Sequence, residues 1–99
     1  MAEEKALFVP KGAGGYFCKV KVQRRRTGEC EISFDGLMDD LAFLLGVDSK
    51  RPIRRRFDIE GVEVSLIDKN SLVFKRQEQR MNYDEVVTFL GKKTTLKRI

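Results

Sequence analysis

The stretch of residues 53–76 limits the fold most, because apolar and polar residues alternate along three short runs that turn residues separate. Within each of the first two runs, apolar residues share one parity. They are Ile53, Phe57 and Ile59 in the first run and Val62, Val64 and Leu66 in the second. Alternation of this kind is typical of strands with one buried face, and Glu60-Gly61 and residues 68–71 suit tight turns. The stretch therefore predicts a three-stranded antiparallel meander whose apolar face needs a cover. Arg55 breaks the pattern, so we expect the regular strand to begin after it.

Three further runs near the N-terminus have strand character. Residues 16–24 alternate in the same way, and the apolar parity resumes in residues 30–34 after a polar segment at residues 25–29. These two runs predict a β-hairpin. Residues 6–9 form a short apolar run that Pro10 ends, which suits an edge strand.

The apolar period changes in two other segments, which predicts helices at residues 36–45 and 83–90. The first has an apolar stripe made of Leu37, Met38, Leu41, Leu44 and Leu45. Asp35 can cap the first helix and Asn82 the second, and a glycine follows the last apolar residue of each. The acidic pair at residues 39–40 suits the dipole of the first helix, and we prefer that explanation to metal binding or acid–base chemistry.

These elements predict an α+β fold: an antiparallel sheet of five to six strands with two helices packed on one face, in the order β-β-β-α-β-β-β-α. Residues 1–99 are long enough for a single domain, with residues 1–5 and 92–99 as flexible tails. The side chains that we expect to be largely buried are Phe34, Leu41, Leu44, Phe57, Val64, Leu66, Phe74, Val86 and Leu90.

The two halves of the chain end alike, with DDLAFLLG at residues 39–46 and DEVVTFLG at residues 84–91. The predicted order of elements, in which strands are followed by a helix and this arrangement occurs twice, is similar to that of the strand-rich, helix-terminated repeats of the Pur-alpha and Whirly families of single-strand-binding proteins. The similarity lies in the order of the elements and not in a shared motif.

Cysteine and histidine usage bears on chemistry and compartment. The chain has no histidine and only two cysteines, Cys18 and Cys30, so the usual Cys and His ligands of a zinc site are missing. We expect no metal and no other cofactor. No Ser or Cys nucleophile has an evident base, which argues against an enzyme. We expect two reduced thiols that face the core from neighbouring strands, with the hairpin register left open. No signal peptide or membrane span is recognisable, which favours the cytoplasm or another reducing intracellular compartment.

Charge bears on the partner. The chain has 20 Lys and Arg against 15 Asp and Glu, a formal net charge of +5, and a basic surface attracts phosphates. Arginines gather at the hairpin tip, residues 24–26, and at the start of the meander, residues 50–56. We expect Glu29 and Glu31 to neutralise Lys19 and Lys21 across the hairpin, so that the arginines remain as uncompensated charge. Several basic clusters could then lie together at one rim of the sheet.

These features favour a small nucleic-acid-binding module, for RNA or single-stranded DNA, that acts through an arginine-rich rim and a strand face. Phe17 shares the polar face of its strand with two lysines, an arrangement that suits single strands. The predicted contact residues are Arg24, Arg25, Arg26, Arg54, Arg56, Lys19, Lys21 and Phe17.

Two other hypotheses use the same charge. One is a protein-binding adaptor or inhibitor that docks on an acidic surface of a larger enzyme or assembly. The other is a structural component of a ribonucleoprotein or of a multi-subunit assembly. Neither involves a membrane, and the sequence leaves the oligomeric state open. Competition by single-stranded oligonucleotides of mixed sequence separates the adaptor from the nucleic-acid-binding module.

Overall fold

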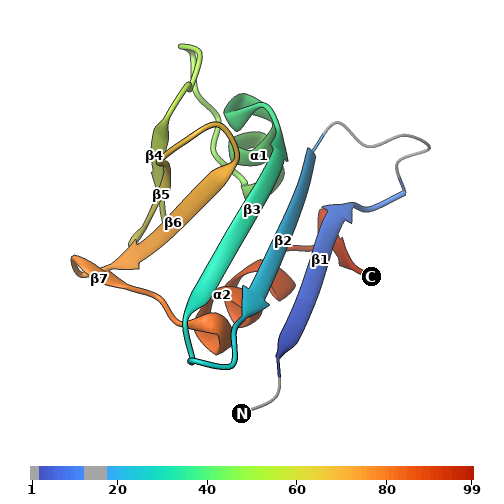
Figure 1. Ribbon diagram of the computed structural model, residues 1–99. Coiled ribbons are helices and arrows are strands. Elements are labelled where there is room, and N and C mark those ends of the chain that lie inside the picture. Colours follow the sequence, from blue (N-terminus) through green and yellow to red (C-terminus); the bar gives the residue numbers. More distant parts are fainter. Residues whose placement is uncertain (1–2, 13–17) are drawn as a thin grey trace.

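A computed structural model describes residues 3–12 and 18–99 of the chain (Figure 1). The described residues form eight strands and two helices. The elements are β1 (Glu4–Pro10), β2 (Cys18–Arg24), β3 (Cys30–Gly36), α1 (Met38–Leu45), β4 (Arg56–Ile59), β5 (Val62–Leu66), β6 (Ser71–Arg76), β7 (Gln79–Arg80), α2 (Tyr83–Gly91) and β8 (Leu96–Arg98).

The strands form one antiparallel sheet in the order β4-β5-β6-β3-β2-β1-β8, and the short β7 pairs with β6 beside this path. The sheet bends into a half-barrel, and in Figure 1 both helices lie behind it while the front face stays open. The predicted α+β class and the antiparallel sheet with two helices are confirmed. The predicted number of strands, five to six, is too low.

One core lies between the sheet and the helices. Alternate residues of the central strands point into it, as in β2, where Cys18, Val20 and Val22 are almost fully buried. Leu41 from α1 and Leu90 from α2 are fully buried on the helix side of the same core. Eight of the nine side chains predicted to be buried are so, and the ninth, at the end of β5, is half-buried.

The meander forms as the alternation predicts. β4 begins at Arg56, so the regular strand starts after Arg55 as expected. Glu60 and Gly61 both have positive φ, 51° and 79°, the backbone conformation of the tight turn that matches the twist of a hairpin.

The two helices begin in different ways. The predicted cap of α1, Asp35, lies within β3 instead, and the helix starts after Leu37, whose side chain makes no capping bond. The cap of α2 is confirmed: Asn82 accepts a hydrogen bond from the Glu85 backbone N–H at 2.9 Å, and the Glu85 carboxylate accepts one from the Asn82 N–H at 3.1 Å.

Strands β7 and β8 are absent from the elements that the sequence predicts. Residues 92–99 are predicted to be a tail, whereas in the structure Leu96 is buried and lies opposite Pro10 of β1. Three residues with a single apolar side chain carry no periodic signal. The strand forms because β1 offers a free edge, on which the Leu7 carbonyl accepts the Ile99 N–H at 2.8 Å. β1 is therefore not the edge strand that the sequence predicts, since β8 lies outside it, and it begins at Glu4, inside the predicted N-terminal tail.

Candidate functional site

The structure separates the two predicted arginine clusters. The tip of the β2–β3 hairpin lies at the end of the sheet near α2, whereas residues 50–56 lie at the opposite end, beside α1 (Figure 1). The length of β3 runs between them. The clusters therefore do not converge on one rim, and each has to be considered as a surface of its own.

Arg24 is a structural clamp. Its guanidinium bonds to Glu4 of β1, lies 3.9 Å from a carboxylate oxygen of Asp84 on α2, and sits 5.4 Å from the ring centre of Tyr83. Only 23% of the side chain is exposed. Because two carboxylates offset its charge and three elements meet around it, Arg24 contributes more to packing than to the external field.

The next two arginines differ from each other. Arg25 donates a hydrogen bond of 2.8 Å to the Glu31 carboxylate, and this bond lowers the pKa of Glu31 and raises that of Arg25. Arg26 is exposed, and no residue in the described ranges forms an ion pair with it. The tip therefore presents one uncompensated guanidinium in place of the three that the sequence predicts.

The hairpin register changes the expected lysine pairs. Arg24 lies opposite Cys30, which places Lys19 opposite Asp35 and Lys21 opposite Ser33. Neither lysine therefore lies directly opposite Glu29 or Glu31, although the charge of Lys21 still helps to lower the pKa of Glu31. Phe17, predicted to share their face, lies outside the described residues.

The lysines line a groove on the open face of the sheet. It has a volume of about 440 Å³ and is lined by Leu7, Lys19, Lys21, Ser33, Phe34, Asp35 and Asn70. The lining mixes two ammonium groups with one carboxylate and one half-buried apolar side chain, that of Leu7. Lys19 and Lys21, the described lysines of the predicted strand face, thus lie in one groove.

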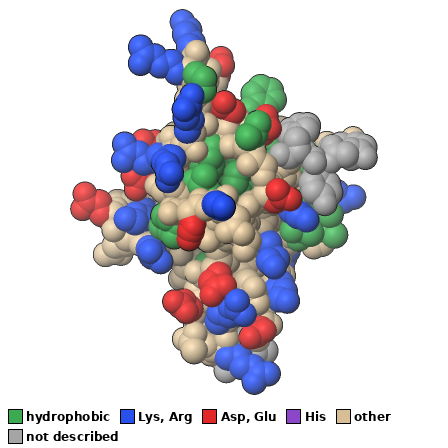
Figure 2. All heavy atoms as spheres, turned by 45° about the horizontal axis from the view of Figure 1, so that its top comes forward, with side chains coloured by type: hydrophobic (Ala, Val, Ile, Leu, Met, Phe, Trp, Pro, Cys, Tyr) green, Lys and Arg blue, Asp and Glu red, His purple; other side chains and the backbone are tan. Residues whose placement is uncertain are grey.

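The connection between α1 and β4 carries most of the net charge of the protein. Residues 47–56 contain five of the 20 Lys and Arg residues but only one of the 15 Asp and Glu residues, so they hold +4 of the formal net charge of +5. Four of these cations are exposed and form no ion pair with any described residue; we call them the basic loop: Lys50, Arg51, Arg54 and Arg55. Arg56, the fifth, lies 3.3 Å from a Glu63 oxygen. Figure 2 shows basic side chains on the projection that this connection makes.

A hollow of about 310 Å³ lies between the basic loop and α1. Its lining residues come from the helix and from the connection that follows it: Asp39, Phe43, Val47, Asp48, Ser49, Lys50, Arg51, Pro52 and Ile53. The ring of Phe43 is 73% exposed, and Val47 and Ile53 are half-buried against the core. An accessible aromatic ring, an apolar floor and two cations therefore share one depression.

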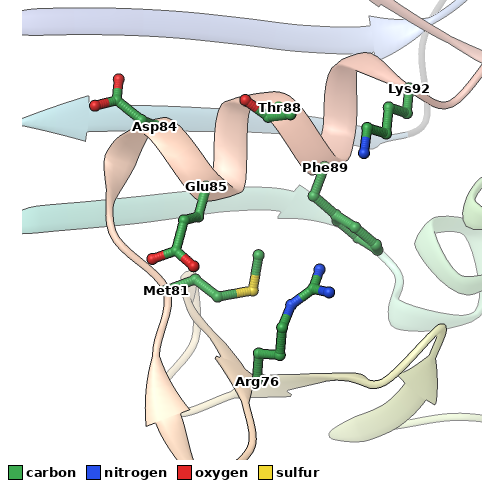
Figure 3. A pocket seen from close by; sticks show the side chains of 7 residues that line it. All are labelled: Arg76, Met81, Asp84, Glu85, Thr88, Phe89 and Lys92. Carbon is green, nitrogen blue, oxygen red and sulfur yellow. The ribbon is translucent and has the colours of Figure 1, made fainter.

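A second hollow, of about 290 Å³, lies between α2 and the β6–β7 turn (Figure 3). Its polar groups are Arg76, Asp84, Glu85 and Lys92, with both signs of charge. The Glu85 carboxylate caps α2, and the ring of Phe89 is buried although it lines the hollow. Glu85 and Phe89 are thus used by the fold, and the remaining charges of the hollow have both signs, so it is the weaker candidate.

Sequence reasoning identified the density of residues 50–56 but missed Phe43. The signal was present, since Phe43 is the one aromatic residue of its helix that falls outside the apolar stripe. The partners of Arg24 had no such signal, because they lie 20 and 60 residues away along the chain.

The acidic side chains and the two cysteines are the remaining groups that could take part in metal or thiol chemistry. Residues 3–12 and 18–99 contain no group of three Cys, Asp or Glu side chains placed to hold a metal ion. Both cysteines are free, and they lie at opposite ends of the hairpin because Cys18 faces Gly36. Burial, together with the nearby Asp40 and Asp35, raises the pKa of the Cys18 thiol to about 12. Neither described helix has the length and apolar character needed to cross a bilayer.

Comparison with protein-family models, with curated proteins and with solved structures finds no match for this chain.

Proposed function

We propose that the protein binds single-stranded nucleic acid, RNA or single-stranded DNA, and that the basic loop makes the main contacts to phosphate. The observation that carries the proposal is the concentration of net charge in ten residues whose cations are exposed and mostly unpaired. Such cations gain most from a phosphate backbone, since no internal ion pair has to be broken and counterions are released from the nucleic acid. Guanidinium groups also match the geometry of phosphate oxygens.

The structure changes the weight of the individual predicted contacts. Arg54 stays a main contact as part of the basic loop, and Arg56 becomes secondary because it shares its charge with Glu63. Lys19, Lys21 and Arg26 supply weaker contacts on the strand face and at the hairpin tip. The remaining predicted residue of the strand face, Phe17, stays a prediction.

The second candidate is an adaptor that docks on an acidic protein surface. It is favoured by two large apolar side chains of the α1 region that are exposed, Leu37 at 68% and Phe43 at 73%. Singly exposed apolar residues are common, but two beside a strongly basic segment suit a protein partner with acidic and apolar groups.

Fluorescence anisotropy with labelled single-stranded and double-stranded oligonucleotides, over a range of salt concentrations, tests the proposal. The decisive variant replaces the four cations of the basic loop with glutamine. The matched control removes the same charge elsewhere, from four exposed lysines without ion pairs in the described structure: Lys5, Lys69, Lys92 and Lys97.

We expect the basic-loop variant to bind more weakly and to lose up to about 3 units of the salt slope, at roughly 0.7 per phosphate contact of a single strand. The control should keep most of both. If the unchanged protein binds no oligonucleotide at low salt, or if both variants lose equally, the nucleic-acid proposal is wrong and the adaptor takes its place.

A further inference from the structure

Exposure alone does not make Phe43 functional, because isolated exposed apolar side chains are common on protein surfaces. What distinguishes it from the equally exposed Leu37 is its surroundings. Phe43 lines the hollow beside the basic loop, whereas Leu37, at the start of the helix, does not.

Hydrogen bonds hold the walls of this hollow in place. The Ile53 backbone N–H donates to a carboxylate oxygen of Asp39 at 2.6 Å, and this bond joins the C-terminal part of the connection to α1. The Ser49 hydroxyl donates to the Arg51 carbonyl at 2.8 Å and accepts from its N–H at 3.2 Å. In the N-terminal part, the Val47 N–H donates to the carbonyl of Ala42 at 2.8 Å. The depression therefore exists before any ligand arrives, which limits the entropic cost of binding.

The lining of the hollow suits a ligand that has both a flat apolar group and an anionic group, because its apolar and basic residues favour different parts of such a ligand. Phe43, Val47 and Ile53 offer apolar surface, while the carboxylates of Asp39 and Asp48 in the same lining repel a phosphate. Lys50 and Arg51 also line the hollow, are exposed to solvent, and attract a phosphate. A ligand with a planar ring joined to a phosphate, the ring inside and the phosphate outside, satisfies both parts of the lining.

We infer that this hollow takes one unstacked nucleobase, which packs on the ring of Phe43 while its phosphate contacts Lys50 or Arg51. The inference rests on the proposed function and adds to it the residue that selects single strands. A base inside a duplex is stacked on both sides and cannot enter, so Phe43 adds affinity only for unpaired nucleotides. The groove on the open face of the sheet has no exposed aromatic ring among its described lining residues, and the hollow beside α2 has only a buried one.

The first experiment compares Phe43→Ala with the matched control Leu37→Ala in the anisotropy assay. Phe43→Ala should weaken single-strand binding by about 5- to 150-fold, the range expected for one base on one aromatic ring. It should leave the salt slope and duplex binding unchanged. Leu37→Ala should bind as the unchanged protein does.

The second experiment uses the absence of tryptophan from the chain. Phe43→Trp introduces a single tryptophan, and a stacked base should quench its fluorescence and shield it from acrylamide. The indole in Leu37→Trp should show neither effect.

The outcomes separate the inference from the proposed function. Loss of binding in the basic-loop variant together with full single-strand binding by Phe43→Ala overturns the inference alone. So does equal quenching in Phe43→Trp and Leu37→Trp. If the unchanged protein binds no oligonucleotide, both proposals fail, and the exposed ring is left to the adaptor hypothesis.

Discussion

The Asp39 carboxylate on α1 accepts a hydrogen bond from the backbone N–H of Ile53, with an N–O distance of 2.6 Å. This bond joins two segments 14 residues apart and satisfies an N–H that forms no sheet pair. It also fixes the end of the connection from which Arg54 and Arg55 project. Asp39, which the sequence predicts only to favour the dipole of α1, thus also holds the connection to β4 in place.

Replacing Asp39 should loosen the connection in a graded way. Asp39→Ala removes the acceptor and should cost about 1 to 2 kcal/mol in the free energy of unfolding. Asp39→Asn keeps a carbonyl oxygen and loses only the charge, so it should cost less than about 1 kcal/mol. Hydrogen exchange at the Ile53 amide is the direct measurement, and it should accelerate in the alanine variant and stay nearly unchanged in the asparagine variant. Equal protection in all three proteins would show that the bond does not hold the connection.

Arg24 and Arg26 should show opposite behaviour although they lie in one run of three. Arg24→Ala should destabilise the fold by about 1 to 2 kcal/mol, because it removes an ion pair and a stacked cation among β1, β2 and α2. Arg26→Ala should change stability by less than about 0.5 kcal/mol and should weaken oligonucleotide binding slightly. Urea denaturation and anisotropy on the same two variants measure both effects. If Arg24→Ala instead weakened oligonucleotide binding without loss of stability, the hairpin tip would be a main contact surface, as the sequence predicts.

Local patterns in the sequence predicted most of the fold. The period-two runs gave the meander and the hairpin, and the change of period gave both helices, because each signal lies within one element. Strand β8 was missed because its pairing depends on the free edge of β1, almost the whole chain away. The candidate site likewise has features that the sequence predicts and features that depend on distant contacts. The density of residues 50–56 is readable in the sequence, but the compensation of Arg24 by Glu4 and Asp84 is visible only after folding.

Leu41 and Phe43 provide a matched test of the orientation of α1. Leu41 is fully buried, so Leu41→Ala should cost about 2 to 5 kcal/mol through lost transfer energy and the cavity left behind. Phe43→Ala removes a larger side chain from an exposed position and should cost less than about 0.5 kcal/mol. Chemical denaturation measures both. A larger loss for Phe43→Ala would mean that its ring packs against the protein, and the hollow beside it would then be unavailable to a base.

Strand β8 should contribute to stability despite its three residues. Leu96→Ala should cost about 2 to 3 kcal/mol, because the side chain is buried beside the end of β1. The exposed neighbour Lys97 is the control, and Lys97→Ala should change the free energy of unfolding by less than about 0.5 kcal/mol. Equal values for the two variants would place residues 92–99 in the flexible tail that the sequence predicts.

Cys18 should make the stability of the protein fall at alkaline pH. Burial raises the pKa of its thiol from 9.0 to about 12, so the folded protein keeps the proton where the unfolded chain loses it. The contribution is fully present below pH 9 and is lost progressively as the pH rises from about 9 toward 12, at up to roughly 1.4 kcal/mol per pH unit for one proton.

Urea denaturation of the unchanged protein and of Cys18→Ala between pH 8 and 10.5 tests this, because the comparison isolates the contribution of the thiol. The difference in unfolding free energy between these two proteins should shrink as the pH rises. Cys30→Ala is the control, since Cys30 is only half-buried and should show a weaker trend in the same direction. A constant difference between the unchanged protein and Cys18→Ala across this range would mean that the thiol ionises as readily in the folded chain as in the unfolded one, and hence that water reaches this end of β2.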